Sequence, residues 1–559
     1  TAHKSSRAPA PITTPRRTIE CMKAFLPSVR SIATACEIQP ASTRALKFSR
    51  LPHPRPTYFI VSIAALPFSL ASPLTRILRT HTLTLPLMTA SLPFPTIAKI
   101  TASIRSKKIS PVELVESHLR RIESLQPKLN AFVHLDAAGA RAQARAGEAA
   151  VVQNQPLGPL HGVPLTLKSC IDVAGWTCPA GSLLRKDYVP RADAPLVSRL
   201  KSAGAILLGN TNTPEFLMAY ETNNLVTGKT SNPWNLAYSA GGSSGGEGAA
   251  IAAGCSMGGV GSDGGGSIRV PAHFCGICGL KPTPGRIPAT GHFPSGAGAF
   301  GWIGVVGPMA RTIDDVRALF EVMAGPDPGD AHSAPVSFRS YSEKDLRGMR
   351  IGILQSSALG NSTPETCAAV DRAAKWLSAR GFGVEPFELR GLDRALELWW
   401  FFFGPVIARL LNANLADHES QLSPMLREYL SNATSPDPLS LDQFIQACAE
   451  RDLLREKILR QMDNITILLS PVSSAPAFRH GEGNYRPGTG YRDTMRYSQW
   501  LNLVGFPGAS VPVSLSGDGL PIGVQIIGKP FEDELVLAGA QALEQSRGPW
   551  PSPPPFQNL

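Results

Sequence analysis

Charged residues are scarce in this 559-residue chain, and periodic patterns are lacking. Asp, Glu, Lys and Arg make up 17% of it, and the sequence has neither a sustained heptad pattern nor a repeat of fixed length. These absences argue against a helical bundle, a repeat array and a disordered scaffold. Glycine and proline are plentiful instead, with 51 and 50 residues, which indicates many turns. With 43% hydrophobic residues, the composition favours a large α/β enzyme.

Cysteine and metal-ligand patterns are also sparse. Nine cysteines, an odd number in a long chain, argue against a fully paired disulfide framework. Cys275 and Cys278 form a CxxC, but no second CxxC or histidine pair stands at ligand spacing. We therefore expect two buried small side chains at this motif, and we predict neither a metal site nor a cofactor.

Acidic residues are nearly missing from the first 87 positions. Twelve basic and two acidic residues give this segment a charge of +10, out of +11 for the whole chain. The remaining residues are therefore close to neutral. This distribution argues against a basic face on the folded body, and we expect no nucleic-acid partner.

Residues 1–87 form a leader whose role stays open. Their Arg, Ser, Thr and Pro content resembles an organelle transit peptide. An apolar run at 58–74 has about the minimum length for a membrane span, although prolines interrupt it. The leader is thus a targeting segment, a membrane anchor that contacts the bilayer through this run, or sequence absent from the mature protein, which then starts at Met88. A start at Met88 predicts a cytoplasmic protein, and a real leader predicts a mitochondrial or membrane-associated one.

The body, residues 88–548, alternates helical and strand-like segments. Ser110–Glu113 has the residues of a capping box, and apolar residues at helical spacing then predict a helix to about residue 125. Further helices are expected over 137–152, 192–203 and 312–324, and buried strands over 163–168, 205–208, 465–469 and 523–527. We therefore predict a single large α/β domain with a central mixed sheet flanked by helices.

A mainly helical stretch, residues 337–463, separates two parts of the predicted sheet. We expect this variable region to shape the substrate pocket. Within it, Trp399–Phe403 is a run of five aromatic residues that lines a substrate channel, touches a membrane or packs in the core. Residues 549–559 form a Pro-rich tail.

The window Gly241–Thr283 carries two serine-containing glycine loops. Glycine at this density indicates backbone held at unusual angles or close to a ligand. Ser243 lies in the first loop and Ser267 in the second. A small-residue helix near 247–253 lies between the loops and can bring both serines to one site.

Ser267 has the surroundings of a nucleophile for acyl transfer. Three successive N–H groups before it can converge on one point and bind an oxyanion. They belong to Gly264, Gly265 and Gly266. A serine hydroxyl needs a base, and Lys168 ends an apolar, strand-like run. Burial can lower the lysine pKa from about 10.4 toward neutrality, so that Lys168 deprotonates Ser267 through Ser243.

This window, with Lys168 upstream, resembles the amidase-signature family, which includes fatty acid amide hydrolase, fungal and bacterial amidases and the A subunit of glutamyl-tRNA amidotransferase. The resemblance extends over about 96–544 and includes the motifs NTPEF, GPMARTIDD and GLPIGVQIIG. It implies a largely α/β fold and a Ser–cis-Ser–Lys triad. In that triad Lys168 is the base, Ser243 the cis-serine and Ser267 the nucleophile.

The resemblance also assigns supporting residues and shows two departures. Asp263 and Arg269 match positions that support the loop, and Ser244 matches a secondary hydrogen-bonding serine. Gly264 stands where the family usually has a bulkier residue, which we expect to loosen the oxyanion loop and alter rate or substrate fit. Asn210 stands where many members have a lysine.

Other short motifs have weaker support. Residues 259–264 fit GxGxxG, but no glycine-capped helix follows, so we do not expect nucleotide binding. Residues 241–245 fit GxSxG, the nucleophile elbow of α/β-hydrolases. That motif requires a strand before Ser243, where we expect a loop, and its histidine has only His480 as a candidate. We expect His161 to be structural.

The residues and the resemblance together predict an amidohydrolase that cleaves a small linear amide through an acyl-enzyme. One alternative is the A subunit of a glutamyl-tRNA amidotransferase, which would pass ammonia to a partner-bound tRNA. Another is a catalytically silent binding protein on the same fold. Glu247 and the FCGICGLKP stretch favour the fungal amidases and fatty acid amide hydrolase. The nature of the amide stays open, as does the formation of a homodimer.

Overall fold

The computed structural model describes residues 95–354, 359–360, 362–415, 417–434, 439–483 and 491–554. The chain divides into two compact units, Thr1–Thr82 and Leu83–Leu559, and these described residues belong to the second. The predicted leader, its apolar run and Met88 lie outside the described residues. Within the described residues, no helix is both long and apolar enough to cross a membrane.

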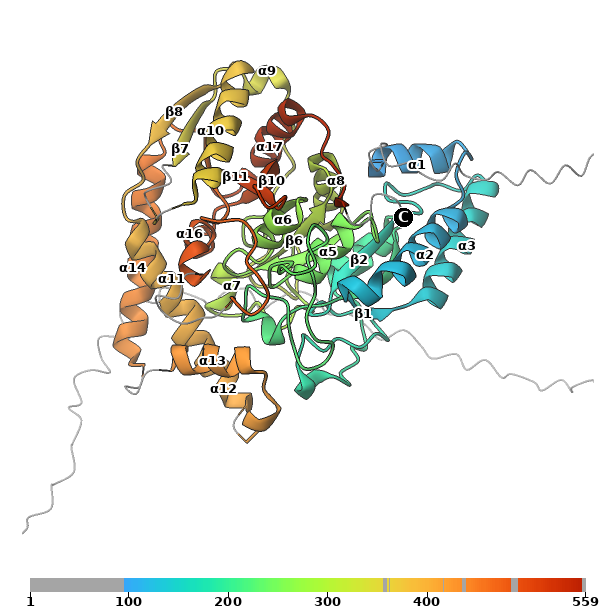
Figure 1. The fold of residues 1–559 in the computed structure, drawn as a ribbon, viewed down its shortest axis with the longest axis horizontal. Helices are drawn as coiled ribbons and strands as arrows, with labels where there is room; N and C mark the ends of the chain where they lie inside the picture. The colour runs from blue at the N-terminus through green and yellow to red at the C-terminus, as the bar shows by residue number, and fades with distance from the viewer. Residues whose placement is uncertain are drawn as a thin grey trace, which may run out of the picture. The chain divides into compact units, whose positions relative to one another are not determined.

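An eleven-stranded sheet forms the centre of the second unit (Figure 1). Its strands follow the order β1-β3-β2-β4-β6-β5-β10-β11-β9-β7-β8. The strands are β1 Phe132–Leu135, β2 Pro164–Lys168, β3 Ile206–Thr211, β4 Gly258–Asp263, β5 Cys278–Lys281, β6 Val305–Ala310, β7 Arg350–Leu354, β8 Gly383–Phe387, β9 Ile467–Pro471, β10 Gly508–Leu515 and β11 Pro521–Ile527. Strand β2 runs parallel to β3 and β4, and β7 runs parallel to β8 and β9, whereas the other neighbours are antiparallel.

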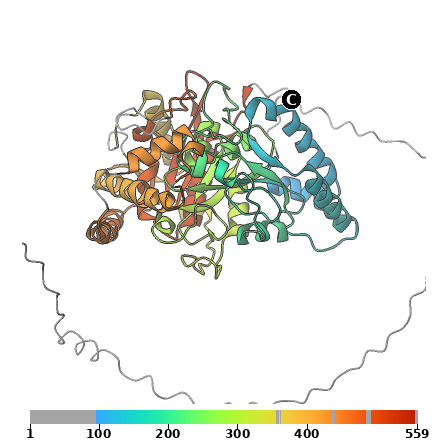
Figure 2. The same ribbon diagram turned by 90° about the horizontal axis from the view of Figure 1, so that it is seen from below.

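Helices flank this sheet, as Figures 1 and 2 show from two directions. They are α1 Ile97–Arg105, α2 Pro111–Leu129, α3 Ala137–Val152, α4 Pro195–Ser202, α5 Gly245–Ala252, α6 Arg269–Cys275, α7 Phe300–Ile303, α8 Ile313–Met323, α9 Glu343–Leu346, α10 Pro364–Ala379, α11 Leu392–Phe401, α12 Ile407–Leu415, α13 Pro424–Ala433, α14 Leu441–Gln461, α15 Tyr491–Thr494, α16 Arg496–Val504 and α17 Asp533–Arg547. A π-helical turn, Phe402–Val406, joins α11 to α12. The predicted α/β domain with a mixed sheet flanked by helices is thus confirmed.

Helix α2 shows how local sequence sets an element. Ser110 and Glu113 form the predicted capping box at its start. The helix continues to Leu129, four residues past the predicted end. Leu125 and Leu129 are both buried, so they extend the apolar stripe by another turn, and Pro127 is accommodated near the helix end.

The variable region 337–463 differs in part from its prediction. It is mainly helical, from α9 to α14, but it also contains β7 and β8, which extend the central sheet beyond β9. These two strands were missed because the segments around them have helical patterns, and periodicity alone cannot assign a run of five residues among such patterns to helix or strand.

Two smaller expectations concern cysteines and the tail. Cys275 and Cys278 are both buried, as expected of small core side chains. The Pro-rich tail begins packed against the body, because the ring of Trp550 lies 5.9 Å from that of Trp234, measured between centroids.

Candidate active site

Lys168 lies at the carboxyl end of β2, fully buried beside the neighbouring strand β4. Its Nζ donates hydrogen bonds to Ser243 Oγ, 2.7 Å away, and to Ser262 Oγ, 3.0 Å away. Burial lowers the pKa of Lys168 to about 8, although nearby carboxylates oppose this shift. A substantial fraction of this lysine is therefore neutral near physiological pH, as a general base requires.

The two predicted serines lie on one pocket. Ser243 is buried, follows a cis peptide bond from Gly242, and its carbonyl accepts a hydrogen bond from Thr213 Oγ1 at 2.7 Å. The carbonyl of Ser267 accepts from the N–H of Ser244 at 3.2 Å, which ties the two serine loops together. Both Ser243 and Ser267 line the same narrow pocket. No hydrogen bond joins their hydroxyls among the described residues, so the structure pairs Lys168 with Ser243 and places Ser267 beside them.

The remaining wall of this pocket is largely apolar. Its other lining residues come from distant segments and include Leu217, Met218, Phe300, Val305 and Phe403. Phe403 belongs to the predicted aromatic run, within which Trp399 and Phe402 are buried as well. The run is therefore core for most of its length, and one of its rings reaches the pocket.

The glycine loop after β4 is held by hydrogen bonds on its carbonyl side. The carbonyl of Gly264 accepts from Trp399 Nε1 at 2.8 Å, and that of Gly265 accepts from Tyr220 Oη at 2.8 Å. The N–H of Gly266 donates to Asp263 Oδ1 at 2.7 Å, so it is already engaged. The N–H groups of Gly264 and Gly265 donate no hydrogen bond within the described part of the chain. Of the three predicted oxyanion donors, these two are free in this conformation.

Asp263 and Arg269 form a fully buried ion pair below this loop, with 3.0 Å between Arg269 Nη2 and Asp263 Oδ1. The Asp263 carboxylate also accepts the N–H of Ile268 at 3.1 Å and the Asn502 side-chain amide at 3.0 Å. Burial alone would raise the pKa of Asp263, but the charge and hydrogen bonds of Arg269, the charge of Lys281 and the N–H of Gly266 hold it well below its usual range. The pair therefore fixes the loop between β4 and α6.

Ser244 and Glu247 occupy the buried side of the first serine loop. Ser244 Oγ accepts the N–H of Ser262 at 3.3 Å, which ties this loop to β4. The Glu247 carboxylate accepts hydrogen bonds from Thr166 Oγ1 at 2.8 Å and Thr211 Oγ1 at 2.9 Å. Burial raises its pKa to about 8. Glu247 thus joins strands β2 and β3 through two threonines next to Lys168.

His292 is a pocket residue that the sequence did not reveal. It lines the same pocket as the two serines. Its Nδ1 lies 2.9 Å from the carbonyl of Pro294 and therefore donates to it, while the buried Nε2 has no partner in the described residues. Burial lowers its pKa to about 4, so the ring is neutral at physiological pH. The surrounding GHFP sequence contains no motif that would have singled it out.

The competing motifs do not form the structures that they require. Most of the GxGxxG match at 259–264 lies in strand β4 rather than in a glycine loop. No strand ends immediately before Ser243, as the nucleophile elbow requires. His480 Nδ1 pairs with Glu221 at 3.0 Å, and His161 Nε2 bonds the carbonyl of Gly147 at 2.9 Å, as expected of a structural histidine. Asn210 donates to the carbonyl of Thr177 at 2.7 Å.

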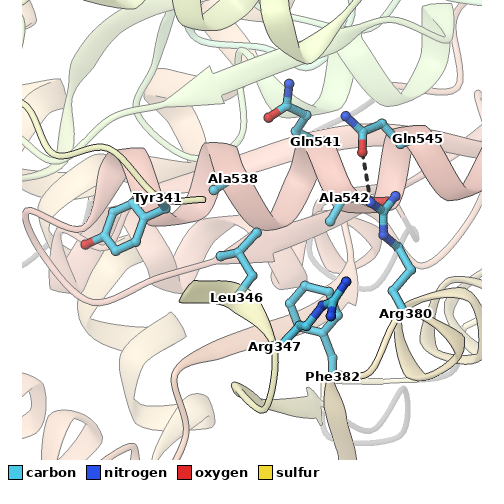
Figure 3. A pocket seen from close by; sticks show the side chains of 9 residues that line it. All are labelled: Tyr341, Leu346, Arg347, Arg380, Phe382, Ala538, Gln541, Ala542 and Gln545. Carbon is cyan, nitrogen blue, oxygen red and sulfur yellow. Dashed lines mark hydrogen bonds between the residues drawn. The ribbon is translucent and has the colours of Figure 1, made fainter. Parts of the chain in front are cut away.

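A second pocket lies away from the serines (Figure 3). Helix α17 forms one wall, and Tyr341, Arg347 and Phe382 face it from other segments. Arg380 donates there to Gln545 Oε1 at 3.0 Å. None of the predicted site residues lines this pocket, and it has no serine, cysteine or histidine to act as a nucleophile. Of the predicted site residues, Ser243, Asp263, Gly264 and Ser267 line the serine pocket instead.

The chain is similar to known proteins over most of its length. The family model named Amidase matches residues 113–537. A curated relative from Carboxydothermus hydrogenoformans, the A subunit of its glutamyl-tRNA(Gln) amidotransferase, is 33% identical over 476 residues, covering 80% of this chain and 96% of the relative.

Two similar solved structures are named as an acylamidase and an amide hydrolase. A bacterial aryl acylamidase of the amidase-signature enzymes has a TM-score of 0.72 and 29% identity, covering 83% of this chain and 99% of that one. A fatty acid amide hydrolase has a TM-score of 0.74 and 26% identity, covering 81% of this chain and 85% of that one.

Proposed function

Because the chain belongs to the Amidase family, we propose that it hydrolyses the C–N bond of a carboxamide through an acyl-enzyme on Ser267. The observation that carries this proposal is the buried hydrogen bond of 2.7 Å between Lys168 Nζ and Ser243 Oγ, on the wall of a pocket that Ser267 shares. Among the described residues Lys168 forms no ion pair, and its Nζ is hydrogen-bonded to two serines, so it is suited to accept a proton.

Acylation starts when neutral Lys168 accepts the proton of Ser243, while Ser243 accepts the proton of Ser267. Ser267 Oγ forms a bond with the carbonyl carbon, and the carbonyl oxygen becomes an oxyanion. The C–N bond then breaks, and the leaving amine takes the proton back from Lys168 through Ser243. The relay requires the two serine hydroxyls to come within hydrogen-bonding distance when substrate binds.

The same relay hydrolyses the acyl-enzyme. Water takes the place of the amine, gives its proton through Ser243 to Lys168, and attacks the Ser267 ester. The ester bond breaks, Ser267 regains a proton, and the carboxylic acid leaves. In both steps the free N–H groups of Gly264 and Gly265 are suited to stabilise the oxyanion. No step requires a metal or a cofactor.

The apolar wall of the pocket supports an uncharged acyl group as the substrate class. Phe300, Val305 and Phe403 offer a carboxamide apolar contacts but no charged partner. Asp263 is also among the residues that line this pocket, but its carboxylate is fully buried and paired with Arg269. We infer that the acyl portion is an aryl or aliphatic group rather than an amino acid.

The second candidate is the A subunit of a glutamyl-tRNA amidotransferase. The 33% identity to a protein of that name favours it. Its chemistry would use the same three residues to release ammonia from an amide donor. A catalytically silent protein is the third candidate, and the intact Lys168, Ser243 and Ser267 argue against it.

Activity of the purified full chain without partners separates these candidates. We expect it to hydrolyse 4-nitroanilides of acetic, butyric or benzoic acid, and to act poorly on free glutamine. The matched control is Ser267→Ala, which should remove the anilide activity. Glutamine hydrolysis, or activity only after a partner is added, would support the amidotransferase candidate. A folded chain that hydrolyses none of these amides would contradict the amidase proposal.

A further inference from the structure

We propose that Trp399 is a positioning residue that aims an oxyanion-binding N–H group at the substrate. Trp399 lies at the end of helix α11 in the variable region, 135 positions from the loop residue that it contacts. Its indole N–H donates to the carbonyl of Gly264 at 2.8 Å. The inference rests on the proposed function, because it assigns a role in the stabilisation of the acylation oxyanion.

Peptide geometry connects this hydrogen bond to the N–H of Gly265, one of the two free donors of the loop. In a planar trans peptide, the carbonyl of one residue and the N–H of the next point in opposite directions. A bond that holds the Gly264 carbonyl therefore also sets the direction of the Gly265 N–H, which points away from Trp399. Asn502 acts in the same way one peptide earlier, because its side-chain amide donates to the Asp263 carbonyl at 2.9 Å and thus orients the Gly264 N–H.

The loop needs such anchors because of its glycines. Gly264, Gly265 and Gly266 follow one another, and glycine has more accessible backbone conformations than any other residue. The Gly264–Gly265 peptide can therefore rotate unless something holds its carbonyl. Oxyanion stabilisation depends on donors that are already oriented before charge develops.

The position of Trp399 is itself well fixed. Its side chain is 1% exposed, and its ring stacks on Phe403 with 4.7 Å between centroids and 14° between planes. A Cβ on residue 265 would lie 2.4 Å from Trp399 Cζ2, so glycine at that position allows the indole to approach the loop. Phe403 lines the serine pocket, so the variable region 337–463 contacts both the pocket, through Phe403, and the glycine loop, through Trp399.

The test compares Trp399→Phe with Trp500→Phe. Both indoles are fully buried, but the Trp500 N–H has no partner among the described residues, so its loss is a control for the smaller ring. For the best 4-nitroanilide, we expect Trp399→Phe to lower kcat roughly 10- to 100-fold with little change in KM. The inhibition constant of a matching trifluoromethyl ketone, which forms an oxyanion on the nucleophile, should rise by a similar factor. Trp500→Phe should leave both quantities within about threefold of the wild type.

A second variant distinguishes loss of the hydrogen bond from a packing defect caused by the smaller phenylalanine ring. Benzothienylalanine at residue 399 keeps the bicyclic ring and removes only the N–H donor, and we expect it to reproduce the loss in kcat and inhibitor affinity. Wild-type kinetics in this variant, or equal losses in Trp399→Phe and Trp500→Phe, would overturn the inference. If the wild type neither hydrolyses anilides nor binds the ketone, the proposed function fails instead.

Discussion

The glycine-rich window 241–283 and the helical region 337–463 contribute to one pocket in different ways. The window supplies chemical groups, Ser243 and Ser267, whose residue types and flanking glycines are readable in the sequence. The helical region supplies Trp399 and Phe403, which belong to an aromatic run that the sequence assigns equally to a channel, a membrane contact or the core. The comparison teaches that reactive groups can be identified by local pattern, whereas the groups that aim them depend on tertiary contacts.

The largest expected effect concerns the window. Ser267→Ala removes the only group that we propose to become acylated, so kcat for amide hydrolysis should fall by about 10⁴-fold or more. The measurement is steady-state hydrolysis of the best anilide, with a thermal unfolding curve as the control for folding. If Ser267→Ala kept even a tenth of the wild-type activity, Ser267 would not be the nucleophile.

A substitution in the Asp263–Arg269 ion pair beneath the loop should change the stability of the fold rather than a chemical step. Asp263→Asn leaves Arg269 as a buried charge without its partner, and we expect a loss of about 3–5 kcal/mol in the free energy of unfolding. The control is Glu450→Gln, which breaks an ion pair of 2.6 Å with Arg394 on helices α11 and α14. That pair is exposed, and its loss should cost about 1 kcal/mol or less. Equal losses in chemical denaturation would contradict the distinction between the two pairs.

The pH dependence of the reaction tests the environment of Lys168. The base must be neutral, and burial lowers its pKa to about 8, so activity should be lost as the pH falls through that value. Below it, kcat/KM should decrease about tenfold per pH unit, and above it the rate should level off. A profile that is flat between pH 6 and 9 would exclude Lys168 as the base.

The smallest effect concerns the contact between the two regions. A Cβ on residue 264 would lie 3.3 Å from Phe403 Cε2 and 3.6 Å from Phe300 Cε2. Gly264→Ala should therefore narrow the pocket and lower kcat/KM severalfold, about 3- to 10-fold, for benzoyl anilides. Acetyl anilides should lose less, because their acyl group needs less room. A larger loss for the acetyl than for the benzoyl substrate would show that residue 264 does not limit acyl size.

The central strand β4 shows where sequence reasoning about the fold reaches its limit. Helix α2 was predictable from its capping box and apolar spacing, but β4 has the sequence GGVGSD and no alternation of apolar and polar residues. Glycine is required at positions 259 and 261 of β4 because other side chains approach its backbone too closely for a Cβ atom. A Cβ on Gly259 would lie 2.2 Å from Glu247 Oε2, and one on Gly261 would lie 2.8 Å from Ser244 Oγ. These contacts join segments that only the fold brings together.

The same limit applies to the site. The sequence predicted a relation between Lys168 and Ser243, and the structure places them in direct contact. Asn502 and His292 could not be predicted from local sequence. The Asn502 amide bonds a loop carbonyl 239 positions away, and His292 is a single histidine in a loop without a recognisable motif.

The most direct test of the central claim is to locate the covalent adduct. The purified full chain is treated with a fluorophosphonate, digested, and analysed by mass spectrometry. The account predicts one adduct on Ser267, with labelling that is strongly slowed in Lys168→Ala and in Ser243→Ala. An adduct on Ser243, or on a serine outside this pocket, would contradict the assignment of the nucleophile. A folded wild type that stays unlabelled while it hydrolyses amides would contradict the acyl-enzyme mechanism itself.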